Sequence, residues 1–139
     1  MGNSQSIKKI NYEDMQTVIK NSEIYLLINT LPSTNQECLI TNTVSIDQEE
    51  AIINKYMKEN RNIRVVIYGK NCNDEQVDKK YQQLLTLGFY NVFIYRGGLF
   101  EWLLLQDIFG KELFPTNKKE LDILKYKAPS VLNISLIEY

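Results

Sequence analysis

Histidine is absent from this chain of 139 residues, and cysteine occurs only twice, at Cys38 and Cys72. Without histidine the chain lacks the commonest general base and the commonest metal ligand, and it cannot form a Ser-His or Cys-His nucleophile pair. Two cysteines are also too few for a disulfide scaffold or a structural zinc site. We therefore expect a reducing compartment, no metal and no cofactor.

The chain also lacks an excess of charge, since it has 16 basic and 17 acidic residues and a net charge of −1. This balance argues against nucleic acid as a partner, which would require clustered Lys and Arg. No apolar run approaches the ~20 residues of a membrane span, and no secretory signal is recognisable, so we expect a cytoplasmic protein. The abundance of Ile, Asn, Lys and Tyr is typical of an AT-rich genome, such as that of a protist or a large DNA virus.

Short apolar runs alternate with amphipathic segments along most of the chain. The runs at 24–28 (IYLLI) and 63–68 (IRVVIY) are nearly continuous, as in strands buried on both faces of a parallel sheet. The pattern predicts an α/β fold, a three-layer single domain with a mostly parallel central sheet and helices on both faces. Predicted strands are 24–28, 44–46, 63–68 and 92–95; predicted helices begin at 11, span 47–59, lie between 74 and 88, and span 99–108 and 117–126.

Caps and breakers set the expected limits of the domain. Asn11 is expected to cap the first helix, an Asp47-x-x-Glu50 pair to cap the second, and Gly88 to end the third. We expect a flexible tail over residues 1–10, one domain over 11–127, and a strand or arm over 128–139.

Three local signatures occur in order between the expected elements. They are LLINTLP (26–32), CLITNTVSI (38–46) and LGFYNVFIYRGGLFEW (87–102). Over residues 11 to 114 the chain therefore resembles the rhodanese-like (sulfurtransferase-type) family. Independently of that resemblance, Gly97 and Gly98 would permit positive φ at a tight strand-to-helix turn, and Trp102 lies one helical turn later, placed to pack on the sheet.

The resemblance implies a catalytic loop directly after the strand at 63–68. Active members carry cysteine at the first loop position and usually arginine at the sixth, and the loop amides stabilise a persulfide. Here those positions are Gly69 and Asp74. An acidic residue and an arginine expected near the first strand are replaced by Asn29 and Leu31. The active-site-like loop, extended to its acidic neighbour, comprises Gly69, Lys70, Asn71, Cys72, Asn73, Asp74 and Glu75.

Cys72 leaves an alternative open, because it lies in the same loop beside Lys70 and near a helix N-terminus that would favour a thiolate. Against it, two carboxylates nearby, Asp74 and Glu75, would raise a thiol pKa and repel anionic substrates. The same two residues are also expected to cap and complement the first turn of the next helix. Phosphatase action is disfavoured, since the loop offers no arginine for bidentate phosphate binding. Cys38, in an apolar setting, is expected to be a small buried residue.

The first six residues, MGNSQS, fit the Met-Gly-x-x-x-Ser/Thr pattern of N-myristoylation, with Gly2 as the lipidation site. One acyl chain gives marginal, reversible membrane binding, which Lys8 and Lys9 would strengthen near an anionic leaflet. The sequence thus predicts a catalytically degenerate binding module with a protein partner, peripheral on a cytosolic membrane face. The alternative is a sulfurtransferase that uses Cys72 as a persulfide carrier.

Overall fold

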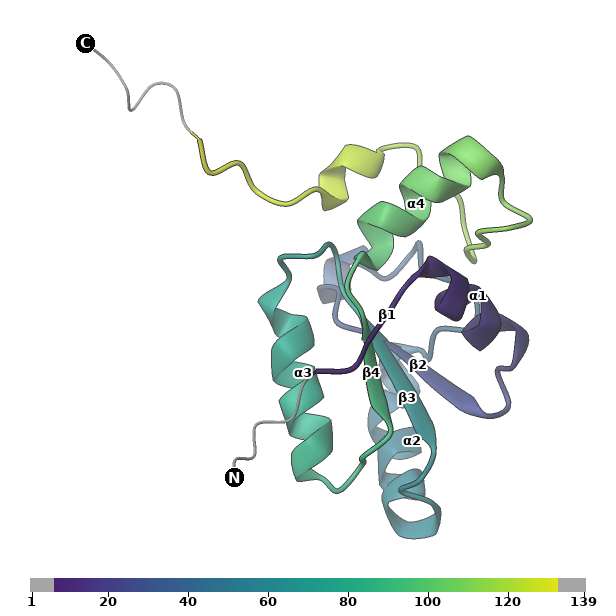
Figure 1. Ribbon diagram of the computed structural model, residues 1–139, viewed down its shortest axis with the longest axis vertical. Coiled ribbons are helices and arrows are strands. Elements are labelled where there is room, and N and C mark those ends of the chain that lie inside the picture. The colour runs from purple at the N-terminus through teal and green to yellow at the C-terminus, as the bar shows by residue number, and fades with distance from the viewer. Residues whose placement is uncertain (1–6, 133–139) are drawn as a thin grey trace.

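A computed structural model describes residues 7–132 of the chain. A four-stranded parallel sheet in the order β1-β4-β3-β2 forms its centre (Figure 1). The strands are β1 (Lys9–Ile10), β2 (Tyr25–Asn29), β3 (Arg64–Tyr68) and β4 (Val92–Tyr95). The helices are α1 (Tyr12–Lys20), α2 (Ile46–Glu59), α3 (Glu75–Thr86) and α4 (Gly98–Phe109), with 3₁₀ turns η1 (Ser33–Asn35) and η2 (Ile123–Tyr126).

Two apolar layers cover the sheet, one on each face. Alternate strand residues point to opposite faces, so Val66 contributes to one layer while Val65 and Ile67 contribute to the other. Helices α1 and α4 pack on the first face, through residues such as Met15 and Trp102. Helices α2 and α3 pack on the second face. This arrangement confirms the predicted α/β class with helices on both sides.

Side-chain caps fix where the helices begin. Asn11 caps α1 in a reciprocal box, accepting from Asp14 N at 2.9 Å while its own N–H donates to the Asp14 carboxylate at 3.2 Å. The predicted cap at Asp47 is wrong: Ser45, two residues earlier, is the N-cap of α2, and the helix begins at Ile46. Asp74 caps α3, and its Oδ1 accepts from Gln76 N at 2.9 Å.

The strand predicted over 44–46 is wrong. Only one isolated parallel bridge forms there, between Leu27 and Thr43, and Val44 N donates to Leu27 O before the chain turns into α2. The apolar residues Val44 and Ile46 lead into helix α2 and do not form a strand paired with a neighbouring strand. A short segment of this composition satisfies either pattern locally.

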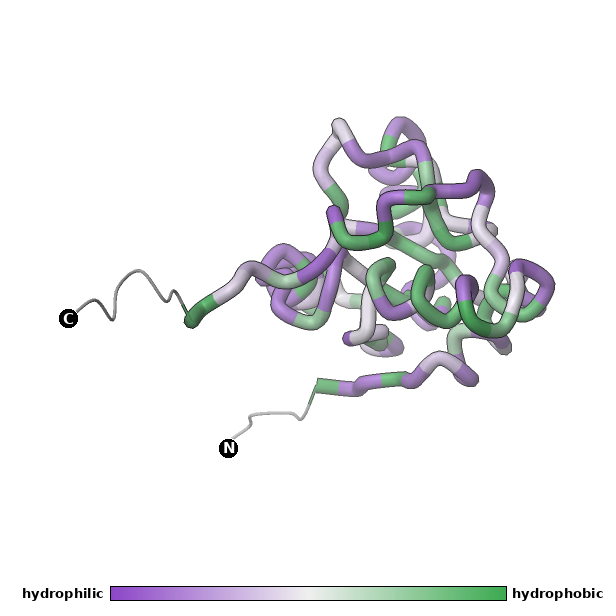
Figure 2. The backbone as a smooth tube through the Cα atoms, turned by 90° about the horizontal axis from the view of Figure 1, so that it is seen from above, coloured by the Kyte–Doolittle hydropathy of each residue, from purple (hydrophilic) through white to green (hydrophobic). Residues whose placement is uncertain are grey.

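The ends of the domain also differ from expectation. Lys9 and Ile10, expected in the tail, pair with Ile94 and Tyr95 as β1, which is too short to show an alternating pattern. The helix predicted over 117–126 is wrong, because only the 3₁₀ turn η2 forms, held by packing on α4 rather than by its own periodicity. Beyond η2 the chain extends from the body with its apolar residues exposed (Figure 2). The predicted strand or arm lies largely outside the described residues.

Candidate functional site

The loop over residues 69–74 leaves the carboxyl end of β3, at the centre of the sheet. In parallel α/β sheets this edge is where ligands bind, because loops from neighbouring strands meet there. Thr30 N donates to Tyr68 O, which joins the segment after β2 to the end of β3. The predicted loop residues therefore occupy the position at which a site is expected.

Asp74 turns back into the loop that it ends. Its Oδ2 accepts from Lys70 N at 3.0 Å and from Thr30 Oγ1 at 3.1 Å, while Oδ1 caps α3 through Gln76 N. A carboxylate that accepts loop and helix amides takes the role that a bound anion has in such a cradle. The predicted cap at Asp74 is confirmed, and the carboxylate also acts inside the loop.

Gly69 has no room for a side chain. A Cβ built on its backbone would lie 2.3 Å from Asp74 Oδ2, 2.6 Å from Val77 Cγ2 and 2.8 Å from Thr30 Oγ1. All three distances are below any normal van der Waals contact for a Cβ atom. The Asp74 carboxylate thus occupies the space where a residue other than glycine at position 69 would place its side chain.

The turn before α4 closes over the same loop. Gly98 has φ +69°, and a Cβ there would meet Gly69 O at 2.8 Å and Asn71 N at 2.9 Å. Gly97, also predicted to adopt positive φ, instead has φ −58°. Leu99 N donates to Gly69 O at 2.9 Å, and Phe100 N donates to Lys70 O at 2.9 Å. The first amides of α4 are therefore bound to loop carbonyls.

Asn71 is the buried anchor of the loop, only 7% exposed. Its Nδ2 donates to Tyr126 O at 2.8 Å, and its Oδ1 accepts from Asn73 N at 2.9 Å. Tyr126 is itself 1% exposed, so η2 closes over the loop as part of the core. No local pattern predicts this contact, because its partners are 55 residues apart.

Cys72 is exposed, and its Sγ donates to Asn73 Oδ1 at 3.7 Å. The N–H groups of Lys70 and Asn73 already donate to other loop side chains. Glu75 begins α3 and is exposed, as its helix-start role predicts. The loop residues predicted together are therefore together, with the Cys72 thiol on their outer side.

Cys38 is buried as predicted, at 3% exposure, and its Sγ donates to Lys118 O at 3.2 Å. Burial raises the pKa of this thiol.

Lipidation at Gly2 falls outside the described residues. Within residues 7–132, no cluster of three or more Cys, Asp or Glu side chains could hold a metal ion, and no helix is both long and apolar enough to span a membrane.

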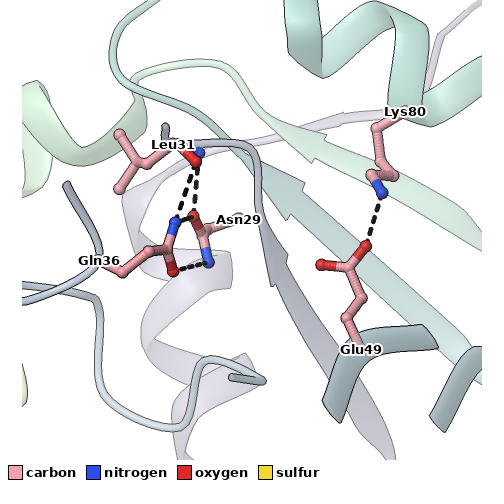
Figure 3. Close-up of polar contacts among 5 residues, drawn as sticks. All are labelled: Asn29, Leu31, Gln36, Glu49 and Lys80. Carbon is pink, nitrogen blue, oxygen red and sulfur yellow. Dashed lines mark hydrogen bonds and ion pairs between the residues drawn. The ribbon is translucent and has the colours of Figure 1, made fainter. Parts of the chain in front are cut away.

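Asn29 and Leu31 lie beside the loop and carry no charge, and the Asn29 side chain is hydrogen-bonded to Leu31 and Gln36 (Figure 3). Asn29 is 3% exposed; its Oδ1 accepts from Leu31 N at 2.9 Å and from Gln36 Nε2 at 2.7 Å, and its Nδ2 donates to Gln36 Oε1 at 3.1 Å. Leu31 is buried in the apolar layer. Neither position retains a charge that could pair with an anion.

A groove of about 510 Å³ runs between α2 and α3 and reaches the segment after β2. Its wall carries the Glu49–Lys80 ion pair at 2.6 Å, with both side chains at most a quarter exposed (Figure 3). The sequence analysis missed this pair, since periodicity shows each helix face but not which helices are neighbours. The pair joins α2 to α3, and the exposed Lys79 also lines the groove.

This architecture is similar to that of known proteins. The chain matches the rhodanese-like domain family over residues 15–105. A crystal structure of the Alr3790 protein from Anabaena sp. is similar, with 19% identity, coverage of 84% of this chain and 86% of that one, and a TM-score of 0.56. The BH2092 protein from Bacillus halodurans shares 18% identity over 74% of each chain, with a TM-score of 0.58.

A third similar structure is the single-domain sulfurtransferase RDL2 from Saccharomyces cerevisiae. It shares 15% identity, with coverage of 74% of this chain and 94% of that one, and a TM-score of 0.51. No curated protein sequence matches the chain. The family match covers more than half of the sequence and agrees with the sheet, the loop after β3 and the glycine turn before α4. The chain belongs to the rhodanese-like domain family.

Proposed function

We propose that this protein is a non-catalytic member of its family, a binding module that retains the fold without sulfur-transfer chemistry. The observation that carries the proposal is the Asp74 carboxylate, which accepts Lys70 N and lies 2.3 Å from where a Cβ on Gly69 would be. Sulfur transfer in this family requires a thiolate at that position and loop amides free to hold an anion. Here one residue removes the thiol, and another supplies a fixed negative charge of its own.

Electrostatics support the same conclusion. A thiosulfate or persulfide anion entering the loop would meet Asp74 and the neighbouring Glu75, and like charges disfavour binding at such short range. Asn29 and Leu31 supply no compensating positive charge. The N–H groups of Lys70 and Asn73, already bound to a carboxylate and an amide oxygen, would have to exchange those partners before stabilising a ligand.

The rival function is sulfur transfer through Cys72, whose thiol is accessible in the same loop. Thiosulfate:cyanide sulfurtransfer of the purified protein beside a Cys72→Ser control separates the two. We expect no turnover above the control and no gain of one sulfur mass in the intact protein after thiosulfate treatment. Turnover that requires Cys72 would overturn the non-catalytic proposal.

We further propose that the module is tethered to a cytosolic membrane face by myristoylation of Gly2, and that it acts there by binding a protein. The support is the MGNSQS terminus, with Lys8 and Lys9 shortly after it. A single acyl chain binds membranes with an association constant on the order of 10⁴ M⁻¹, so nearby cations would matter.

Co-expression with an N-myristoyltransferase tests the tether. We expect the intact mass to increase by one myristoyl group and the full-length protein to sediment with vesicles. Gly2→Ala should block both effects without changing the folded domain, because Gly2 lies outside the family match at residues 15–105. If wild type and Gly2→Ala sediment equally, the tether proposal fails.

A further inference from the structure

Basic and aromatic side chains gather at the amino ends of the strands, on the α1/α4 face of the sheet. Lys8 Nζ lies 5.6 Å from the Phe93 ring centre and donates to Tyr90 O at 3.3 Å. Arg64 Cζ lies 5.7 Å from the Tyr25 ring centre. We call Lys8, Tyr25, Arg64, Tyr90 and Phe93 the amino-end patch. Helix α4 does not cover it, since α4 lies at the carboxyl ends of the strands (Figure 1).

The patch has the composition of a membrane-interface surface. Lys8 and Arg64 are exposed, Tyr90 is 58% exposed, and the Tyr25 and Phe93 rings are half-buried. Aromatic rings favour the headgroup level of a bilayer, and Lys and Arg favour anionic headgroups. Beside the two rings lies a small, largely apolar hollow of about 160 Å³.

An acidic side chain, Asp14, also lines that hollow. Its carboxylate accepts from Asn11 N, and its own N–H donates to Asn11 Oδ1 in the capping box of α1. Asp14 is thus committed to a helix start rather than to either cation. Both cations lie over ring faces, and both residues are exposed.

Strand β1 begins beside this patch. It runs parallel to β4, with Lys9 paired to Ile94, so it starts at the amino ends of the strands. Gly2 is six residues before Lys8, a reach of at most about 20 Å. An acyl chain on Gly2 would bring the amino-end patch toward the same bilayer.

Lys8 and Lys9 point to opposite faces of β1. Ile10 packs with the α1/α4 layer and Ile7 with the α2/α3 layer, so Lys8 shares the first side and Lys9 the second. The charge of Lys9 acts on Asp78 of α3, whose carboxyl pKa it helps to lower, after the larger effect of Arg96. Lys8 therefore lies on the α1/α4 side of the sheet, and Lys9 lies on the α2/α3 side.

We propose that the amino-end patch is the face that this domain presents to an anionic membrane; this inference rests on the proposed acyl tether. The acyl chain and the two patch cations, Lys8 and Arg64, then bind one surface together. Each cation held near an anionic leaflet strengthens binding about fivefold.

Sedimentation of the myristoylated full-length protein tests the proposal, with vesicles of phosphatidylcholine alone or mixed with phosphatidylserine. We expect Lys8→Gln and Arg64→Gln each to weaken binding to the mixed vesicles about fivefold, and Lys9→Gln to weaken it less than twofold. None of the three should change binding to neutral vesicles. Equal losses for Lys8→Gln and Lys9→Gln, or no loss for either, would overturn the proposal while leaving the tether intact.

A fluorescent label gives an independent readout of orientation. In a Cys72→Ser background, Tyr90→Cys places a thiol on the patch and Lys79→Cys places one on α3. We expect brominated lipid to quench a label at 90 and not at 79. Quenching at 79 alone would assign the membrane to the opposite face. If the wild type is acylated but fails to sediment, the acyl chain is held elsewhere, such as in the small hollow, and both proposals fail.

Discussion

At the scale of single residues, the Asp74 carboxylate at the start of α3 occupies the space that a side chain at position 69 would need. The Asp74 carboxylate bonds Lys70 N and Thr30 Oγ1, and in doing so fills the space beside the Gly69 backbone. Restoring a cysteine at 69 therefore requires a change at 74 as well. The two departures from the family pattern are physically coupled.

Gly69→Cys alone should destabilise the protein by about 1–3 kcal/mol, because its Cβ would overlap Asp74 Oδ2 and Val77 Cγ2. Asp74→Ser keeps an N-cap oxygen but loses the bonds to the loop, at a cost of about 1–2 kcal/mol. Because serine vacates the Oδ2 position, the double variant should lose at least about 1 kcal/mol less than the sum of the two single losses. Urea unfolding of the four proteins measures this difference; strict additivity would show that the two residues do not share the space.

These residues also show how much of the site could be predicted from sequence. The missing cysteine, the missing arginine and the helix cap at Asp74 were predicted from the order of loop residues. That the Asp74 carboxylate turns into the loop was not, because a cap fixes one oxygen and leaves the other to tertiary contacts. The role of Asn71 was missed for the same reason, since its partner at Tyr126 is remote in sequence.

At the scale of elements, the loop is held from outside by η2. Asn71 Nδ2 donates to the carbonyl of Tyr126, and both residues are buried. Removing one partner of a buried hydrogen bond leaves the other unsatisfied. The 3₁₀ turn and the loop should therefore open together.

Asn71→Ala should lower the free energy of unfolding by about 1–3 kcal/mol, since the Tyr126 carbonyl and Asn73 N would lose their partner. Hydrogen exchange should accelerate over both 69–74 and 123–127. The exposed neighbour serves as control: Asn73→Ala should change stability by less than about 0.5 kcal/mol. Acceleration confined to the loop would show that η2 does not depend on Asn71.

A second link joins α3 to the end of β4 through Arg96 and Asp78. The guanidinium donates to both carboxylate oxygens, at 2.5 and 3.2 Å. A hydrogen bond from Arg96, with its positive charge, holds the pKa of the Asp78 carboxyl below its ordinary value. The Asp78 side chain is 44% exposed, so solvent screens this pair and its contribution is small.

A carboxyl whose folded pKa is depressed stabilises the protein above its unfolded pKa, about 4, and this stability is lost as pH falls through the folded value. Asp78→Asn should therefore flatten the dependence of stability on pH below about 4. Thermal unfolding between pH 6 and pH 3 measures it, with Glu75→Gln, at an exposed helix start, as control. An unchanged acid slope in Asp78→Asn would contradict a role for the pair.

Strand prediction succeeded where burial made the signal continuous. The runs at 24–28, 63–68 and 92–95 correspond to β2, β3 and β4 within one residue at each end. The predictions at 44–46 and 117–126 were wrong, because an edge segment and a docked 3₁₀ turn take their form from neighbours. The local sequence pattern predicts strands that are buried on both faces. It does not predict the conformation of segments that is set by contacts with other elements.

At the scale of the whole molecule, the two ends of the sheet differ in the residues that they carry. The carboxyl ends hold the loop after β3, whose polar groups bond Asp74, Asn71 and the first amides of α4. The amino ends carry the amino-end patch, beside which β1 begins. With the proposed tether, the loop end of the sheet would be directed away from the bilayer and open to the proposed protein partner.

We propose that Asp74 places the protein's own carboxylate where an anion would bind in this fold. Backbone amide NMR during a thiosulfate titration tests it most directly, with the amides of Lys70 and Asn71 as reporters. We expect these resonances to remain unshifted through millimolar thiosulfate, apart from the uniform ionic-strength drift that sodium sulfate also produces. Saturable shifts confined to residues 69–74, produced by thiosulfate and not by sulfate, would contradict it.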